Sequence, residues 1–244
     1  MADKPISFLD AVKDRYGAAD DTSSYNKDDF LVGDPSKSKK NKTWELVGMD
    51  DMRKKQARLD RIFVVSVKDS SVTVAENIAN EITEAKVVNV TELDLSANPK
   101  LQMTDVDTIV NQMPRLQLVQ LSNIPLGKSL SIPETWTVTK LVLNFSGVDS
   151  IDLLAKVNLP KLEELHLDGN NITSLKTNST SSSSLRFEGV KNLSLAMNSL
   201  DSWEDGGIQE CFTNVFPNLD HVSLSENKLG DLNGVPAEHL SWLA

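Results

Sequence analysis

Aliphatic residues recur along the chain in one spacing, Leu-x-x-Leu-x-Leu-x-x-Asn-x-Leu, with valine or isoleucine often in place of leucine. Three copies match at every position and begin at Leu162, Val190 and Leu219. A fourth copy begins at Val90 and needs one inserted residue before Leu101. Self-similarity at a regular interval predicts a repeat architecture.

Three more copies keep the aliphatic positions but have Ser70, Ile124 or Ser146 in place of the asparagine. The middle aliphatic residues of the seven copies serve as markers: Val65, Leu93, Val119, Leu141, Leu165, Leu193 and Val222. Successive markers lie 28, 26, 22, 24, 28 and 29 residues apart, and leucine-rich repeats have a period of about 20 to 29 residues. The sequence therefore predicts an α/β leucine-rich-repeat solenoid, a horseshoe arc of about seven repeats.

The alternation Leu-x-Leu within each copy predicts a short strand. Its leucines point into the solenoid and the residues between them point outward, so the parallel strands line the concave face. The asparagine amide is expected to bond backbone groups where the chain leaves the strand. Without it, the turns at Ser70, Ile124 and Ser146 are predicted to be less regular.

The connections between strands are predicted to return along the convex face. Residues Thr73–Ala85 and Thr104–Met113 are expected to be helical there. Thr104 with Asp107 three residues later resembles an N-cap signature.

Eleven outward-pointing residues form the candidate partner-binding surface on the concave face. They are Glu92, Asp94, Lys140, Asn144, Glu164, His166, Asp168, Asn192, Ser194, His221 and Ser223. This face is mixed in character and net acidic. We expect it to favour a neutral or basic folded surface over an acidic peptide tail.

The first part of the chain differs from the repeats. Residues 1–16 are predicted to be a helical leader, because Phe8, Leu9, Val12 and Tyr16 fit one helical face. Residues 17–42 consist mainly of Asp, Ser, Asn, Lys and Gly, which predicts a flexible linker. Residues 43–244 are assigned to the leucine-rich-repeat domain.

Charge and composition exclude several classes of protein. The net charge is −10, with 12 basic and 12 acidic residues up to Asp60 and 13 basic and 23 acidic residues after it. This balance argues against a nucleic-acid partner. One cysteine allows no internal disulfide, and neither a secretory signal nor an apolar run of about 18 residues is present. We therefore expect a cytoplasmic protein with no membrane partner.

No catalytic pattern stands out in the sequence. The histidines His166, His221 and His239 are scattered, and with Cys211 they offer no metal-ligand spacing. Cys211 itself is predicted to be a buried thiol. The acidic residues near Glu164 lack the ligand ladder of a calcium site. We expect a protein that is not an enzyme and that carries no cofactor or metal.

The residues before the repeats carry a family resemblance. Phe8–Tyr16 is followed by a polar linker, by Trp44–Gly48, by a helical stretch Lys54–Leu59 and then by Ile62–Val67. This order resembles the segment that joins the two parts of tubulin-folding cofactor E, and the resemblance covers essentially all 244 residues. In that family a glycine-rich domain precedes the segment and a ubiquitin-like domain follows the repeats, so we expect this sequence to be a fragment.

The resemblance implies a function. It implies binding of α-tubulin, and action with other tubulin-folding cofactors in assembly and disassembly of the tubulin heterodimer. It also implies a place in the cytoplasm near the microtubule cytoskeleton, and we expect a monomer. The alternative is a generic cytosolic leucine-rich-repeat adaptor of the phosphatase-regulatory or splicing-factor-like kind, which has no reason to carry the Phe8–Tyr16 leader.

Overall fold

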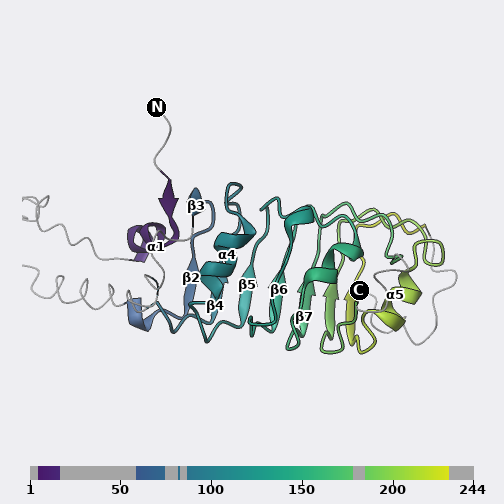
Figure 1. The fold of residues 1–244 in the computed structure, drawn as a ribbon. Coiled ribbons are helices and arrows are strands. Elements are labelled where there is room, and N and C mark those ends of the chain that lie inside the picture. The colour runs from purple at the N-terminus through teal and green to yellow at the C-terminus, as the bar shows by residue number, and fades with distance from the viewer. Residues whose placement is uncertain (1–4, 17–58, 75–81, 83–86, 178–184, 231–244) are drawn as a thin grey trace, which may run out of the picture.

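The computed structural model describes residues 5–16, 59–74, 82, 87–177 and 185–230. Seven short parallel strands form one sheet, and their order in space follows their order along the chain. They are β2 (Val64–Ser66), β4 (Glu92–Asp94), β5 (Leu118–Gln120), β6 (Lys140–Val142), β7 (Glu164–His166), β8 (Asn192–Ser194) and β9 (His221–Ser223). Each repeat adds one strand beside the previous one, which confirms the predicted leucine-rich-repeat solenoid (Figure 1).

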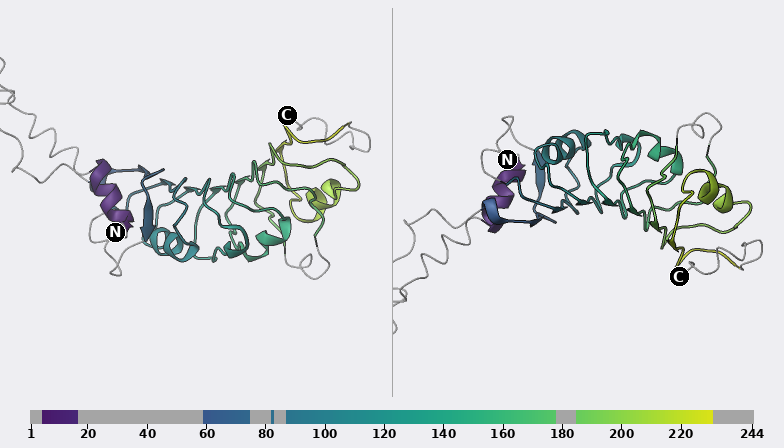
Figure 2. Two further views of the ribbon diagram at one scale, coloured as in Figure 1. Left: turned by 90° about the horizontal axis from the view of Figure 1, so that it is seen from above. Right: turned by 90° about the horizontal axis from the view of Figure 1, so that it is seen from below.

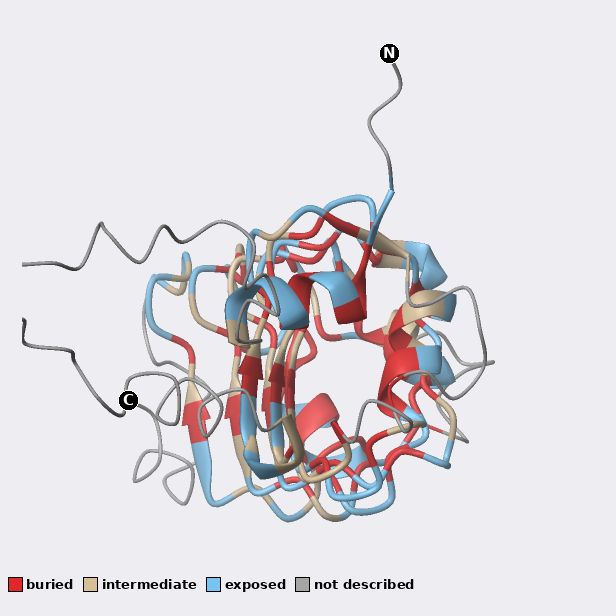
Figure 3. Cartoon of the chain, turned by 90° about the vertical axis from the view of Figure 1, so that its left-hand side faces the viewer, coloured by how far each residue is buried: buried red, intermediate tan, exposed pale blue. Residues whose placement is uncertain are grey.

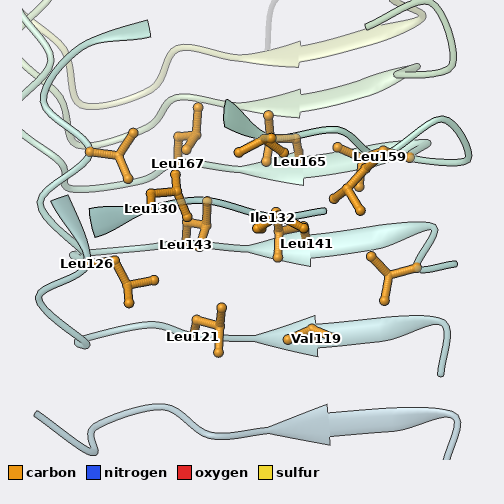
Figure 4. Close-up of a cluster of buried hydrophobic side chains, with 14 of the residues drawn as sticks. Val119, Leu121, Leu126, Leu130, Ile132, Leu141, Leu143, Leu159, Leu165 and Leu167 are labelled. Atoms are coloured by element: carbon orange, nitrogen blue, oxygen red, sulfur yellow. The ribbon is translucent and has the colours of Figure 1, made fainter. Parts of the chain in front are cut away.

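The seven marker residues stack along the inner face of this sheet. The register pairs each marker with the next, from Val65 opposite Leu93 to Leu193 opposite Val222, and none is more than 2% exposed. The second leucines of the alternation form a parallel stack beside them, with Leu143 and Leu167 as neighbours (Figure 4). Burial of one such side chain contributes roughly 1.5–3 kcal/mol, so these aliphatic stacks hold neighbouring repeats together.

The connections return along the convex side as short helical segments. They are α4 (Met103–Val110), η3 (Gly127–Ser129), η4 (Ile151–Lys156) and α5 (Ile208–Asn214). Figure 2 shows the strands along one side of the array and these segments along the other. In the view along the array, the buried residues lie where the two layers face each other (Figure 3). No helix in the described part of the chain is long and apolar enough to cross a membrane.

The helix predicted at Thr104–Met113 is confirmed as α4, which begins one residue earlier and ends at Val110. Its cap differs from the prediction. The N-cap residue is Gln102, whose backbone N–H donates to Asp105 Oδ2 at 3.3 Å. Asp107 instead accepts a hydrogen bond from Trp136 Nε1 at 2.8 Å and thereby ties α4 to the next connection.

The helix predicted at Thr73–Ala85 is wrong at its start. Thr73 and Val74 belong to strand β3 (Val72–Val74), which pairs in parallel with β1 (Ile6–Ser7). Three successive β-branched residues favour a strand over a helix. Most of the remaining predicted helix lies outside the described residues.

Helix α1 (Phe8–Tyr16) closes the first repeat and matches the helical spacing of the leader. Phe8 and Val12 are fully buried and belong to the same apolar core as the repeats. The Tyr16 hydroxyl accepts a hydrogen bond from the Ser66 backbone N–H at 2.9 Å and donates to the Ser66 carbonyl at 3.3 Å. These are groups of the first strand of the sheet, β2. The predicted linker 17–42 and residues 43–58 lie outside the described residues, so the division into leader, linker and repeat domain stays a prediction.

The asparagine position of each repeat forms a column behind the sheet, buried in most repeats and half-buried at Ser70 and Asn227. We call it the turn column: Ser70, Asn98, Ile124, Ser146, Asn170, Asn198 and Asn227. Asn198 is typical, because its Nδ2 donates to the Leu167 carbonyl at 3.0 Å and its Oδ1 accepts from the Ile172 N–H at 3.0 Å, both in the preceding repeat. The asparagine amides therefore bond backbone groups at the turn, as predicted, and the structure shows that they also join consecutive repeats.

The residue before each turn-column position lies at the rim of the solenoid. We call this set the rim column: Asp69, Ala97, Asn123, Phe145, Gly169, Met197 and Glu226. All seven have positive φ, between 55° and 65°. Six are not glycine, and a side chain in this left-handed region costs about 1 kcal/mol.

The rim residue has the same left-handed φ in every repeat, including those with Ser70, Ile124 and Ser146. A further positive φ occurs at Ser71, Gly127 and Gly147 in these three repeats and at Asn171 in an asparagine repeat, so the predicted irregularity stays a prediction. Ser146 also replaces the asparagine chemically, since its hydroxyl donates to the Leu121 carbonyl at 2.7 Å. In six repeats the rim N–H donates to a carbonyl of the next repeat at 2.8–3.0 Å, for example Phe145 to Asp168. Backbone hydrogen bonds thus set the turn even where the asparagine is missing.

Candidate functional site: the concave face of the sheet

The outward side chains of the seven strands form a continuous surface on the concave face. In every strand the middle residue is buried, and most of its flanking residues are half-buried or exposed. Nine of the eleven predicted surface residues flank a buried strand residue in this way. The other two, Asn144 and Asp168, occupy the next outward position along their repeats.

The prediction left out positions of the same surface. Val64, Ser66, Leu118, Gln120 and Val142 are the outward residues of β2, β5 and β6. The same Leu-x-Leu alternation in the degenerate repeats marks them. They make the face less charged than the predicted set, because none of the five carries a charge.

A charged cluster lies on β6 and β7 near the middle of this surface. Glu164 Oε1 lies 2.8 Å from Lys140 Nζ and 2.6 Å from His166 Nε2. Lys140 and Glu164 are register partners on adjacent strands, so their contact also supports the sheet. Partial burial by itself would raise the pKa of Glu164, but the hydrogen bonds from Lys140 and His166 outweigh it and hold that pKa below its ordinary value.

Asp168 connects three consecutive repeats. Its Oδ2 accepts from Asn144 Nδ2 at 3.0 Å, and its Oδ1 accepts from the Ser194 hydroxyl at 2.5 Å and from the Ala196 N–H at 2.9 Å. Its own N–H donates to Asn144 Oδ1 at 2.9 Å. A carboxylate with this many donors is held in place. Asp168 therefore supports the array, and a substitution there affects more than the surface.

Asp94 has a similar but smaller role in the first repeats. It accepts from the Ser66 hydroxyl at 3.2 Å and from the Ser96 N–H at 2.9 Å. Glu92 and His221, by contrast, are exposed at the start of β4 and β9. These two residues offer the best positions for testing contact with a partner without disturbing the fold.

The remaining candidate residues are Cys211 and the potential metal ligands. Cys211 is 2% exposed, which confirms the buried thiol, and burial raises its pKa to about 12. The described residues contain no group of three or more His, Cys, Asp or Glu side chains that could hold a metal ion. His239 lies outside the described residues.

Several curated proteins are similar to this chain in sequence. No family model matches the chain. It is 29% identical to tubulin-specific chaperone E of Homo sapiens over 91% of its length, and 27% identical to the protein of that name from Bos taurus over 92%. The chain resembles tubulin-specific chaperone E. This agrees with the family resemblance of the leader and the repeats.

Two further matches extend the comparison. Tubulin-folding cofactor E of Arabidopsis thaliana is 28% identical over 76% of the chain. The chain covers 46% of the Bos taurus protein, 45% of the Homo sapiens protein and 34% of the Arabidopsis thaliana protein, so it spans about half or less of these curated relatives. Among solved structures, an internalin-like protein of Listeria monocytogenes is 18% identical with a TM-score of 0.42, over 76% of this chain and 58% of that one.

Proposed function

We propose that this chain is the leucine-rich-repeat part of a tubulin-folding cofactor and that its concave face binds α-tubulin. The observation that carries the proposal is the similarity to tubulin-specific chaperone E over about nine tenths of the chain. That similarity includes the part before the repeats, which a generic adaptor has no reason to carry.

The form of the concave face supports a protein partner. Solenoids present extended concave surfaces, on which a folded partner contacts several repeats at once. The predicted surface residues include Glu92, Asp94, Glu164 and Asp168 but only one lysine, Lys140. A neutral or basic region of the partner fits this balance of charge.

The proposed role is that of a binding protein, without catalysis of its own and without a cofactor or metal. The chain acts as a monomer in the cytoplasm, together with other tubulin-folding cofactors, in assembly and disassembly of the tubulin heterodimer. The concave face holds one subunit while the other cofactors act on the heterodimer.

The test is capture of purified tubulin by the immobilised chain. Cross-linking followed by subunit-specific antibodies identifies the bound subunit, and we expect α-tubulin rather than β-tubulin. Failure of the chain to capture tubulin would overturn the proposal and favour the generic adaptor. Binding of β-tubulin alone would show that the chain binds β-tubulin and not α-tubulin.

A matched pair of charge reversals tests the concave face. Glu92→Lys changes an exposed residue of the face, and Glu134→Lys makes the same change in an exposed loop that packs against α4 on the convex side through Trp136. We expect about a tenfold higher Kd for Glu92→Lys, most clearly at low salt, and no change for Glu134→Lys. The reverse pattern would assign binding to the convex side.

A further inference from the structure

Two large apolar side chains are exposed at the rim of the solenoid. Phe145 is 50% exposed and Met197 is 47% exposed. Both belong to the rim column, two repeats apart, and both have φ of 55°. Left-handed backbone is best tolerated by glycine and asparagine, and Asn123 occupies this position in the repeat before Phe145.

Gly169 lies between these two residues in the rim column. A Cβ atom added to Gly169 would stand 2.1 Å from Cε1 of Phe145, so the aromatic ring lies directly over the glycine backbone. The ring therefore fills the rim position of its neighbour and extends toward the repeat of Met197. We call Phe145, Gly169 and Met197 the apolar rim patch.

The fold does not explain this patch. The turn has the same φ in repeats where the rim residue is Ala97, Asn123 or Glu226, so a bulky apolar side chain is not needed to form it. Phe145 and Met197 expose about half of their surface while they hold an unfavourable backbone conformation. Exposed apolar side chains on rigid backbone are typical anchors of protein interfaces.

The surroundings of the patch indicate the chemistry of its partner. Ala196 joins Met197 directly to the concave face, where its N–H binds Asp168. Glu226 is the next rim residue after Met197 and is exposed, about one strand spacing or 5 Å away. A partner that presents an apolar side chain beside a basic one therefore fits Met197 and Glu226.

We propose that the apolar rim patch anchors the tubulin subunit on the concave face, by receiving an aliphatic side chain that has a lysine or arginine beside it. This inference rests on the proposed function. The subunit then contacts the polar concave face and the apolar rim together. Phe145 and Met197 lose contact with water against its aliphatic side chain, and Glu226 pairs with its basic residue.

The test uses the double variant Phe145→Asn, Met197→Asn of the full 244-residue chain. Asparagine suits the left-handed turn, so the melting temperature should stay unchanged or rise, while the Kd for purified tubulin should rise about tenfold or more. The control is Ala97→Asn, which makes the same change at the same turn position away from the patch. It should leave the Kd unchanged.

Each result decides the proposal. A double variant that binds tubulin as tightly as the parent would overturn the rim patch and leave the proposed function standing. A lower melting temperature of the double variant would show that the two side chains serve the fold, and would also overturn it. A parent chain that binds no tubulin would overturn both proposals.

A second variant tests the charge of the partner. Glu226→Lys should raise the Kd for tubulin about threefold at low salt, and the effect should shrink at high salt. An unchanged Kd at low salt would overturn the proposed basic neighbour.

Discussion

The turn column and the rim column are adjacent along the chain, yet they differ in what the fold requires of them. Turn-column residues are mostly asparagine or serine, and Asn98, Ser146 and Asn170 are at most 1% exposed. Rim-column side chains range from glycine to phenylalanine on the same backbone conformation. The repeat thus restricts the chemistry of one position and leaves its neighbour free to vary.

The two columns support the same turn in different ways. Asn198 bonds backbone groups of two repeats through both ends of its amide, whereas the rim residues join the ladder through their backbone N–H groups alone. Loss of a side chain should therefore be costly in the turn column. In the rim column the fit to the left-handed backbone and to neighbouring rim side chains should matter instead.

The largest expected effect is that of Asn198→Ala. The substitution leaves the Asn170 and Ile172 N–H groups and the Leu167 carbonyl without their partner inside the core. We expect the free energy of unfolding to fall by about 3 kcal/mol, measured by urea denaturation. Asn192→Ala, on the concave face, is the matched control and should cost less than about 0.5 kcal/mol. Equal losses would break the distinction between inward and outward positions.

Gly169→Ala tests the rim column, where we expect a loss of about 2 kcal/mol. Its φ of 65° disfavours a side chain, and the new Cβ would meet the Phe145 ring. In the Phe145→Ala background the loss should drop to about 1 kcal/mol, because only the backbone cost remains. Urea midpoints of the four proteins measure this coupling, and strictly additive losses would contradict the contact.

Ser146→Ala tests the degenerate turn column. The substitution removes the hydrogen bond from the Ser146 hydroxyl to the Leu121 carbonyl, so we expect a loss of about 1 kcal/mol. This is smaller than the loss at Asn198, since the hydroxyl makes fewer bonds. A loss as large as that of Asn198→Ala would mean that the serine supports the turn as fully as the amide does.

The smallest expected effect is a pH dependence on the concave face. Because the pKa of Glu164 is lowered from its ordinary value of 4.5, its stabilising contribution is present above about pH 4.5 and is lost as the pH falls through the lowered pKa. The urea midpoint of the parent should therefore exceed that of Glu164→Gln at pH 7, and the difference should shrink as the pH falls below 4.5. Glu163→Gln changes an exposed neighbour and is the control. A difference that does not shrink as the pH falls below 4.5 would exclude the ionised carboxylate as its cause.

The sequence predicted the periodic part of the fold well. The marker leucines and the asparagines report buried positions that recur with the repeat, so Leu165 and Asn170 could be placed without the structure. The alternation around Leu165 also placed Glu164 and His166 on the concave face.

Contacts between repeats were harder to predict. The ties of Asp168 to Asn144 and Ser194 join residues 24 and 26 positions apart, and no local pattern indicates them. The left-handed rim conformation was missed because six of its seven residues are not glycine. The strand at Val72–Val74 was missed because it pairs with Ile6–Ser7, which is far away in the sequence.

The hydrogen bonds of Tyr16 affect how copies of the chain can associate. An open strand edge offers its N–H and C=O groups to any extended chain and can start edge-to-edge polymerisation. At Ser66 both groups are already taken by one phenol. Removal of α1 would uncover this edge of β2 and turn a closed end into a site for self-association. Helix α1 therefore covers the hydrogen-bonding groups of Ser66 on this edge, and deletion of residues 5–16 should promote association between copies of the chain.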